Sequence, residues 1–129
     1  MVEHLTIQDK KYPVRIGYSV MKHVKAETGL SFSQALKQAR EKEDLSIYEL
    51  ILYHALKMGA FAETGKSDIP FEMEDMEMLL DLCLYDFMPL FNSEAFFPKK
   101  QIEEMERKME SSEKKHKPTR TNPNPKQKT

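Results

Sequence analysis

The stretch from Ser46 to Gly59, SIYELILYHALKMG, constrains the fold of this chain more than any other. Its apolar residues recur at helical spacing and occupy most sides of the helix that they predict. Such a helix must be covered by other elements, so we expect it to be central. Ser46 and Glu49 match the S-x-x-E pattern of a capping box, which predicts that the helix begins there. We expect it to run on through Gly59 towards Glu63 and to break at residues 64–66.

The N-terminal stretch TIQDKKYPVRIG, residues 6–17, alternates apolar and polar residues on both sides of a polar middle. This alternation predicts a β-hairpin with one apolar face. A turn centred on residues 9 and 10 gives the following opposite pairs: Leu5 with Val14, Thr6 with Pro13, and Ile7 with Tyr12. An isolated hairpin is only marginally stable in water, so its apolar face is expected to lie on the central helix.

The two outer edges of this hairpin are expected to differ in whether a further strand can pair with them. Pro13 has no backbone N–H to donate, so its strand should be an edge strand there. The other edge, around Leu5 and Ile7, remains open to a partner strand or to another copy of the chain. We therefore include Leu5 and Ile7 among the candidate partner-binding residues.

Three further helices are expected around the central one. Ser19 is the expected cap of the first, with Gly29 at its end, and Ser33 is the expected cap of the second. Pro70 should open an acidic third helix, which Pro89 should end or kink. The buried stripe of the acidic helix is expected to hold Met76, Leu79, Leu80, Cys83 and Leu84.

Charge divides the chain into an acidic body and a basic tail. Residues 1–98 hold 10 Lys and Arg against 16 Asp and Glu, whereas residues 99–129 hold 10 against 5. We expect a hairpin-plus-helical domain at 1–98, a charged helical extension at 99–116, and a disordered basic tail at 117–129. The predicted fold class is therefore mainly α, with an N-terminal β-hairpin packed on a small helical bundle.

The chain carries no convincing catalytic equipment. Its four histidines lie in different predicted elements without metal-ligand spacing, and its four glycines form no phosphate-binding loop: His4, His23, His54, His116. We expect His54 to be a core or rim residue of the central helix. Cys83 lies among leucines, which should raise the pKa of its thiol. We predict no enzyme activity, no cofactor, no metal site and no membrane span. A lone buried thiol is typical of a reducing compartment, so we expect a cytoplasmic protein.

Methionine is the remaining unusual feature, since nine residues of this type occur. Flexible methionine side chains suit surfaces that bind varied partners. We take Met73, Met105 and Met109 as candidate partner-binding residues. The alternative is that Met76 belongs to the core and that the others are incidental helix formers.

Several short motifs occur in a characteristic order over residues 3–92. They are Tyr12-Pro13-Val14-Arg15-Ile16-Gly17, Glu27-Thr28-Gly29, Leu50-Ile51-Leu52-Tyr53-His54-Ala55-Leu56 and Ile69-Pro70-Phe71. In this order the chain resembles the tail assembly chaperones of long-tailed, siphovirus-like bacteriophages. Relatives often carry Asn-Gly at the hairpin turn, where this chain has Gln8-Asp9, and an Asp-rich end of the acidic helix, where it has Leu84-Tyr85-Asp86-Phe87.

The resemblance implies a non-enzymatic role in the host cytoplasm. Such a chaperone binds the long, helical tape measure protein and keeps it soluble while tail tube subunits polymerise around it. It then leaves, so it is not expected in the mature virion. In many relatives a programmed frameshift near the end of the reading frame makes a longer product that recruits the tail tube protein. Independently of the resemblance, a homo-oligomer remains open, because another copy of the chain could add to the open edge of the hairpin.

Two other functions remain open on the sequence alone. The first is a small helical regulatory or adaptor protein that binds nucleic acid through its basic tail, although the tail has no aromatic residue to stack on a base. The acidic body opposes that reading, so nucleic acid is not the expected partner. The second is a structural head–tail component that stays in the particle.

Overall fold

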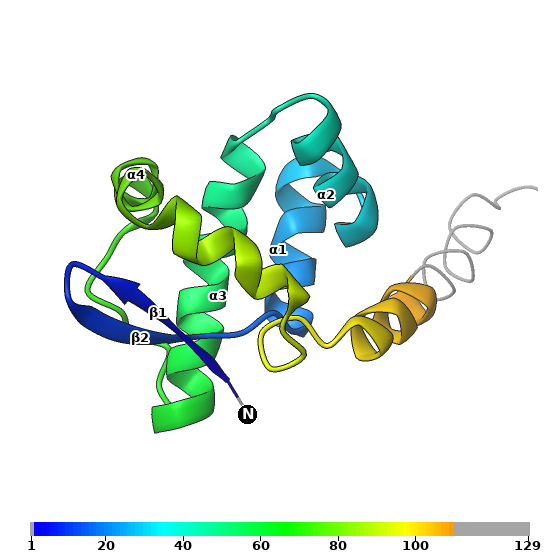
Figure 1. The fold of residues 1–129 in the computed structure, drawn as a ribbon. Coiled ribbons are helices and arrows are strands. Elements are labelled where there is room, and N and C mark those ends of the chain that lie inside the picture. The colour runs from blue at the N-terminus through cyan, green and yellow to red at the C-terminus, as the bar shows by residue number, and fades with distance from the viewer. Residues whose placement is uncertain (1, 110–129) are drawn as a thin grey trace, which may run out of the picture. The chain divides into compact units, whose positions relative to one another are not determined.

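The computed structural model describes residues 2–109 of the chain. Its elements are β1 Glu3–Ile7, β2 Lys10–Val14, α1 Tyr18–Thr28, α2 Phe32–Glu41, α3 Ser46–Thr64, the 3₁₀ turn η1 Met73–Asp75, α4 Met76–Phe87, the 3₁₀ turn η2 Met88–Asn92, and a helical segment at 99–109 (Figure 1). An antiparallel hairpin packs against helices, so the predicted fold class is confirmed for this part of the chain.

The described residues divide into two units, residues 2–99 and residues 100–109. All the elements from β1 to η2 lie in the first unit. The predicted disordered tail at 117–129, and residues 110–116 of the predicted extension, lie outside the described residues.

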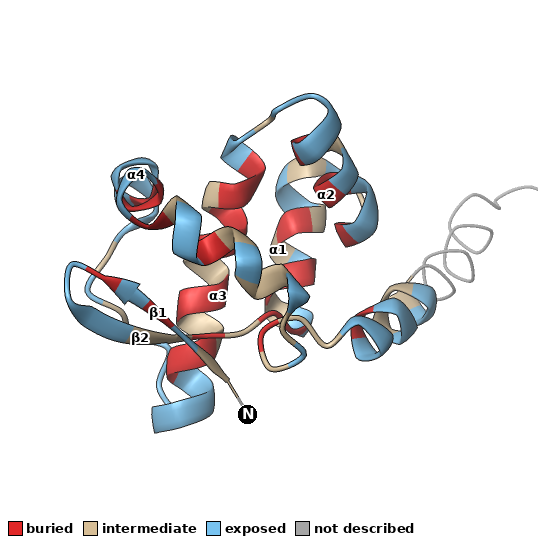
Figure 2. Cartoon of the chain, in the orientation of Figure 1, coloured by how far each residue is buried: buried red, intermediate tan, exposed pale blue. Residues whose placement is uncertain are grey.

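Helix α3 is the centre of the first unit, as predicted. The hairpin, α1, α2 and α4 all contact it (Figure 1), and buried residues follow it for most of its length (Figure 2). It ends at Gly65, whose φ of 80° is in the left-handed region that glycine adopts without strain. The predicted capping box at its start is wrong. Ser46 is already helical, and its hydroxyl donates to Asp44 at 2.5 Å instead of capping a backbone N–H.

The hairpin has the predicted apolar face but a different register. Leu5 lies opposite Tyr12, and Ile7 lies opposite Lys10. The two-residue turn is formed by Gln8 and Asp9, whose positive φ values of 49° and 69° are those of the tight turns that suit hairpins. The prediction placed this turn one residue too late, which shifted the pairing by two. A shift of two leaves every side chain on its predicted face, because side chains alternate with a period of two.

Strand β2 lies directly on α3 at a glycine. A Cβ added to Gly59 would overlap the carbonyl group of Pro13 and would lie 2.5 Å from the Val14 nitrogen. One turn earlier, the Arg15 backbone N–H donates to the Ala55 carbonyl oxygen at 3.2 Å. The strand backbone therefore occupies the space in which any side chain at position 59 would lie.

The first two helices begin at other residues than predicted. Helix α1 begins at Tyr18 with Gly17 as its N-cap, so Ser19 is not a cap, whereas the predicted end at Gly29 is confirmed. The cap of α2 is Ser31 and not Ser33. Ser31 and Gln34 form a reciprocal capping box, each accepting a backbone hydrogen bond of 3.2 Å from the other.

The acidic helix α4 begins later than predicted but ends where expected. The 3₁₀ turn η1 directly precedes α4. It is closed by a 2.7 Å hydrogen bond from the Glu72 backbone N–H to the Asp75 carboxylate. Pro70 precedes the turn and does not open the helix. The predicted stripe is buried except for Leu84, which is half-buried, while Phe87 is completely buried in its place. Phe87 packs edge-on against Phe91 and Phe96 beyond Pro89.

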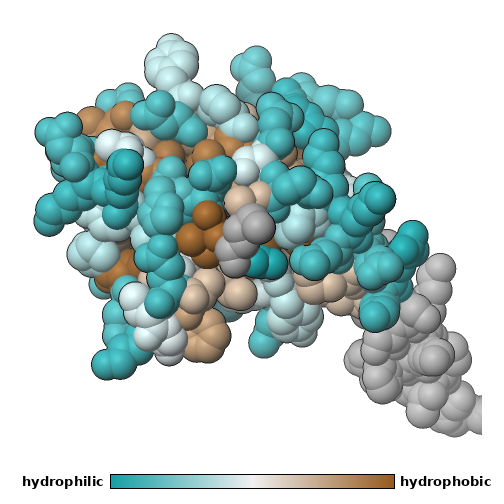
Figure 3. Space-filling view, turned by 60° about the horizontal axis from the view of Figure 1, so that its bottom comes forward, coloured by the Kyte–Doolittle hydropathy of each residue, from teal (hydrophilic) through white to brown (hydrophobic). Residues whose placement is uncertain are grey.

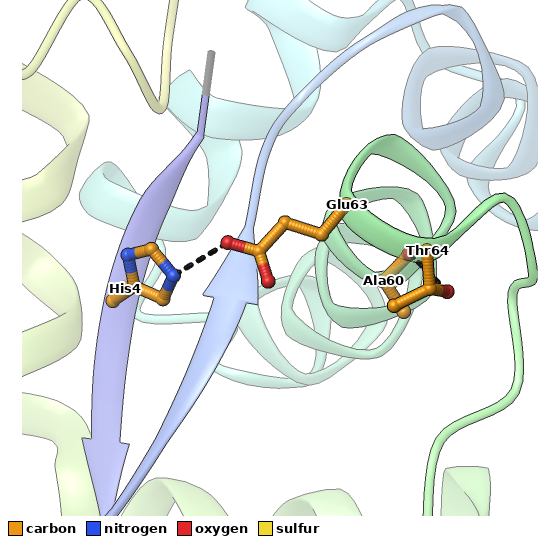
Figure 4. A network of polar contacts seen from close by, with 4 residues as sticks. All are labelled: His4, Ala60, Glu63 and Thr64. Atoms are coloured by element: carbon orange, nitrogen blue, oxygen red, sulfur yellow. Dashed lines mark hydrogen bonds and ion pairs between the residues drawn. The ribbon is translucent and has the colours of Figure 1, made fainter.

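A side-chain hydrogen bond joins the outer face of the hairpin to the end of α3. The His4 Nε2 atom and the Glu63 carboxylate are 2.7 Å apart, and both side chains are well exposed (Figure 4). The side of the molecule that Figure 3 turns toward the viewer is largely hydrophilic, with hydrophobic residues visible between the polar ones. The exposed contact between His4 and Glu63 typically contributes less than about 1 kcal/mol to stability. The hairpin is therefore held on α3 mainly by its buried apolar face.

Candidate partner-binding surface

The candidate residues predicted from the sequence differ in burial and belong to two separate units. Leu5 and Ile7 are buried in the core, so these two residues can offer a partner only their backbone. Met73 is partly exposed in η1, and Met105 and Met109 lie half-buried in the second unit. That these residues bind a partner stays a prediction.

Helix α4 instead carries a row of exposed apolar side chains on the side opposite its buried stripe. Met78 is 70% exposed, Leu82 is 54% exposed and Tyr85 is 94% exposed. Their spacing of four and then three residues places them on one face over about two helical turns. Buried and exposed residues alternate along α4 accordingly (Figure 2). We call Met78, Leu82 and Tyr85 the outer row.

Carboxylates border the outer row on both sides. Glu77 and Asp81 each precede a residue of the row by one position, whereas Asp86 follows one. Because each residue turns the helix by about 100°, the preceding and following residues lie on opposite sides of the row. All three side chains are exposed. The outer row is therefore an apolar stripe between two acidic borders.

A groove runs along one of these borders. Its apolar lining comes from Leu45, Leu80 and Leu84, and its polar lining comes from three carboxylates: Glu49, Glu77 and Asp81. Its volume is about 220 Å³, and Leu45 is 53% exposed at the start of α3. The groove thus combines hydrocarbon walls with concentrated negative charge.

The whole segment around α4 has one sign of charge. Residues 67–98 contain eight Asp and Glu and neither Lys nor Arg: Asp68, Glu72, Glu74, Asp75, Glu77, Asp81, Asp86 and Glu94. All eight side chains are exposed. A surface with this charge attracts cationic partners and repels anionic ones, nucleic acid and anionic lipid included.

A second hollow, of about 420 Å³, lies between α1 and α3. The His23 and His54 rings stack in it with centroids 3.9 Å apart and an angle of 2° between their planes. The remaining lining is largely apolar, with Phe61 and Met58 from α3 and Tyr18 from α1. The expectation that His54 is a core or rim residue is confirmed, since it is half-buried. Sequence spacing alone did not indicate that His23 would be its neighbour.

The environment of this hollow lowers the pKa of His54 to about 4. Burial is the largest cause, followed by the charges of His23 on α1 and Lys57 on α3. The folded protein therefore holds His54 neutral at pH 5, whereas the unfolded chain, with an ordinary pKa of 6.5, is largely protonated there. The contribution of His54 to the free energy of unfolding is therefore fully present above pH 6.5 and is lost as the pH falls towards 4.

We expect the His54→Gln variant to lose less stability on acidification than the wild type. Between pH 7 and pH 5 the difference should be roughly 1 kcal/mol, because the half-exposed ring is partly screened by solvent. Urea unfolding of both proteins at the two pH values measures it. Equal losses in the two proteins would show that His54 does not carry this pH dependence.

The Cys83 thiol of α4 is buried. Burial, with a smaller contribution from the charge of Asp86, raises the pKa of the Cys83 thiol to about 11, as its leucine neighbours led us to expect. At neutral pH the thiol is therefore protonated and a poor nucleophile. Within residues 2–109 no three His, Cys, Asp or Glu side chains are grouped so that they could hold a metal ion. None of the helices in that range combines the length and apolarity that crossing a membrane requires.

Comparison of the chain with protein-family models, with curated proteins and with solved structures finds no match. None of the three residues of the outer row was among the partner-binding residues predicted from the sequence. The available signal was the helical spacing of Met78, Leu82 and Tyr85, on the side of the acidic helix opposite the buried stripe.

Proposed function

We propose that this protein is a tail assembly chaperone of long-tailed bacteriophages, which binds the tape measure protein and keeps it soluble in the host cytoplasm during tail assembly. It acts without catalysis. It helps to recruit tail tube subunits, in part through a longer frameshifted product, and it leaves before the virion is complete. The order of motifs over residues 3–92 supports this proposal, and the outer row of α4 is the structural observation that carries it.

A tape measure protein is long and helical, so before the tube surrounds it, its apolar stripes are exposed to water and prone to aggregation. An amphipathic helix can place such a stripe along the apolar face of another helix. The outer row offers that face on a rigid helix, whose opposite side is fixed by Met76 and Phe87 in the core. Exposed apolar side chains on a stable fold are a feature of interaction surfaces.

The size of the outer row suggests how the chaperone works. From Met78 to Tyr85 the row spans about 10 Å along the helix axis, which matches two turns of a partner helix. One such contact is small compared with a stable protein interface, so each copy should bind weakly. A long partner with many similar stripes can then be covered by many copies, and these can be displaced as the tube grows.

Co-expression with the tape measure protein of the same phage tests the proposal. With the chaperone present, most of the tape measure protein should remain in the supernatant after lysis and should co-purify with the tagged chaperone. Without it, the tape measure protein should sediment. If the tape measure protein sediments equally in both cases, the proposed function is wrong.

A further inference from the structure

We propose that α4 recognises an amphipathic partner helix whose apolar row is bordered by lysine or arginine, and that the groove beside α4 takes one of these cationic side chains. The inference deepens the proposed function and rests on it only for the name of the partner. It specifies the chemistry of the segment within that partner that binds.

The first argument is the charge around the outer row. Glu77 and Asp81 border the row on one side and Asp86 on the other, and residues 67–98 contain no cation to neutralise them locally. A partner helix seated on the row would bring its own flanking residues against these borders. Like charges in this position oppose binding, whereas lysine or arginine would complete pairs along both borders.

The second argument is the composition of the groove. Leu45, Leu80 and Leu84 supply apolar walls, and Glu49, Glu77 and Asp81 supply negative charge at the same place. Lysine and arginine combine an aliphatic stem with a cationic end, so they match both parts of such a lining. A purely apolar side chain would leave the carboxylates without partners, and an acidic one would be repelled.

Other occupants fit this surface less well. A second copy that docked its own α4 here would bring Glu77, Asp81 and Asp86 against the same carboxylates. The basic segment at 117–129 offers cations but no apolar side chain for the outer row. Nucleic acid and anionic membranes are repelled by the charge. A separate helix with both apolar and cationic residues meets both requirements.

Designed peptides test this recognition directly. Three helical peptides of about 18 residues share one leucine row and differ only in the flanking residues, which are lysine, glutamine or glutamate. Fluorescence anisotropy measures their affinity for the full chain at ~50 mM and ~500 mM salt. The lysine peptide should bind at least roughly tenfold more tightly than the glutamate peptide at low salt, and the difference should shrink at high salt. Equal affinities for the three peptides would overturn the inference.

Two controls locate the effect on α4. The variant Glu77→Gln/Asp81→Asn should bind the lysine peptide roughly fivefold more weakly than the wild type. The variant Glu27→Gln/Glu41→Gln removes two exposed carboxylates from α1 and α2 instead. It should change the affinity for the lysine peptide by less than about twofold. Equal losses in the two variants would mean unspecific attraction and would overturn the inference. A lysine peptide with scrambled leucines should bind weakly. If it bound as well as the ordered peptide, the outer row would not be the docking site.

The inference and the proposed function can fail separately. Absence of a charge preference, with the tape measure protein still kept soluble, would refute the inference alone. A clear preference for the lysine peptide, with the tape measure protein still insoluble, would support the inference and refute the proposed function.

Discussion

Replacing Gly59 by alanine is expected to destabilise the fold by at least about 3 kcal/mol. The added methyl group would overlap backbone atoms of Pro13 and Val14, and a strand backbone cannot move aside as the end of a flexible side chain can. The hairpin would have to lift from α3, which would expose apolar side chains that are now buried: Leu5, Ile7 and Val14. Alanine favours the helix by only about 1 kcal/mol over glycine, so the loss dominates. Urea unfolding followed by circular dichroism measures the change.

The Gly29→Ala variant is the matched control for this prediction. Gly29 has a φ of 74° with open space around it, so alanine there meets backbone strain but no overlap. A loss of only about 1–2 kcal/mol is expected. A Gly59→Ala variant as stable as the wild type would show that the hairpin does not lie on α3 in this way.

The parts of the fold that sequence predicted well depend on periodicity. Helix α3 and the apolar face of the hairpin follow from spacings of 3.6 and 2, which many residues specify together. The hairpin register depended instead on whether Gln8 or Asp9 begins the turn, which is a choice between single residues. The wrong caps have the same origin, because Ser31 and Ser33 are both suitable residues and only the tertiary structure selects between them.

The candidate site was harder to predict than the fold. Helical spacing from the predicted buried stripe places Leu82 and Tyr85 on the other side of α4, but it does not indicate whether another element of the fold covers that side. The stacking of His23 on His54 is a contact between two helices, and neither residue is near the other in sequence. Both features depend on which sides of the helices face each other, which short motifs do not specify.

The Leu82→Asp variant is expected to lose most of its binding to the tape measure protein. It places a charge in the middle of the outer row, where a partner's apolar side chains would have to cover it without a compensating cation. The affinity should fall at least roughly tenfold, as for a residue at the centre of an interface. Because Leu82 is 54% exposed, the free energy of unfolding should change by less than about 1 kcal/mol.

Phe61→Asp is the matched control, since Phe61 is 53% exposed but lies on α3 beside the His23–His54 hollow. The most direct measurement is the fraction of tape measure protein that stays in the supernatant when it is co-expressed with the wild type, with Leu82→Asp or with Phe61→Asp. We predict that the wild type and Phe61→Asp keep it soluble and that Leu82→Asp does not. If Leu82→Asp kept it soluble as well as the wild type does, α4 would not be the surface that binds the tape measure protein.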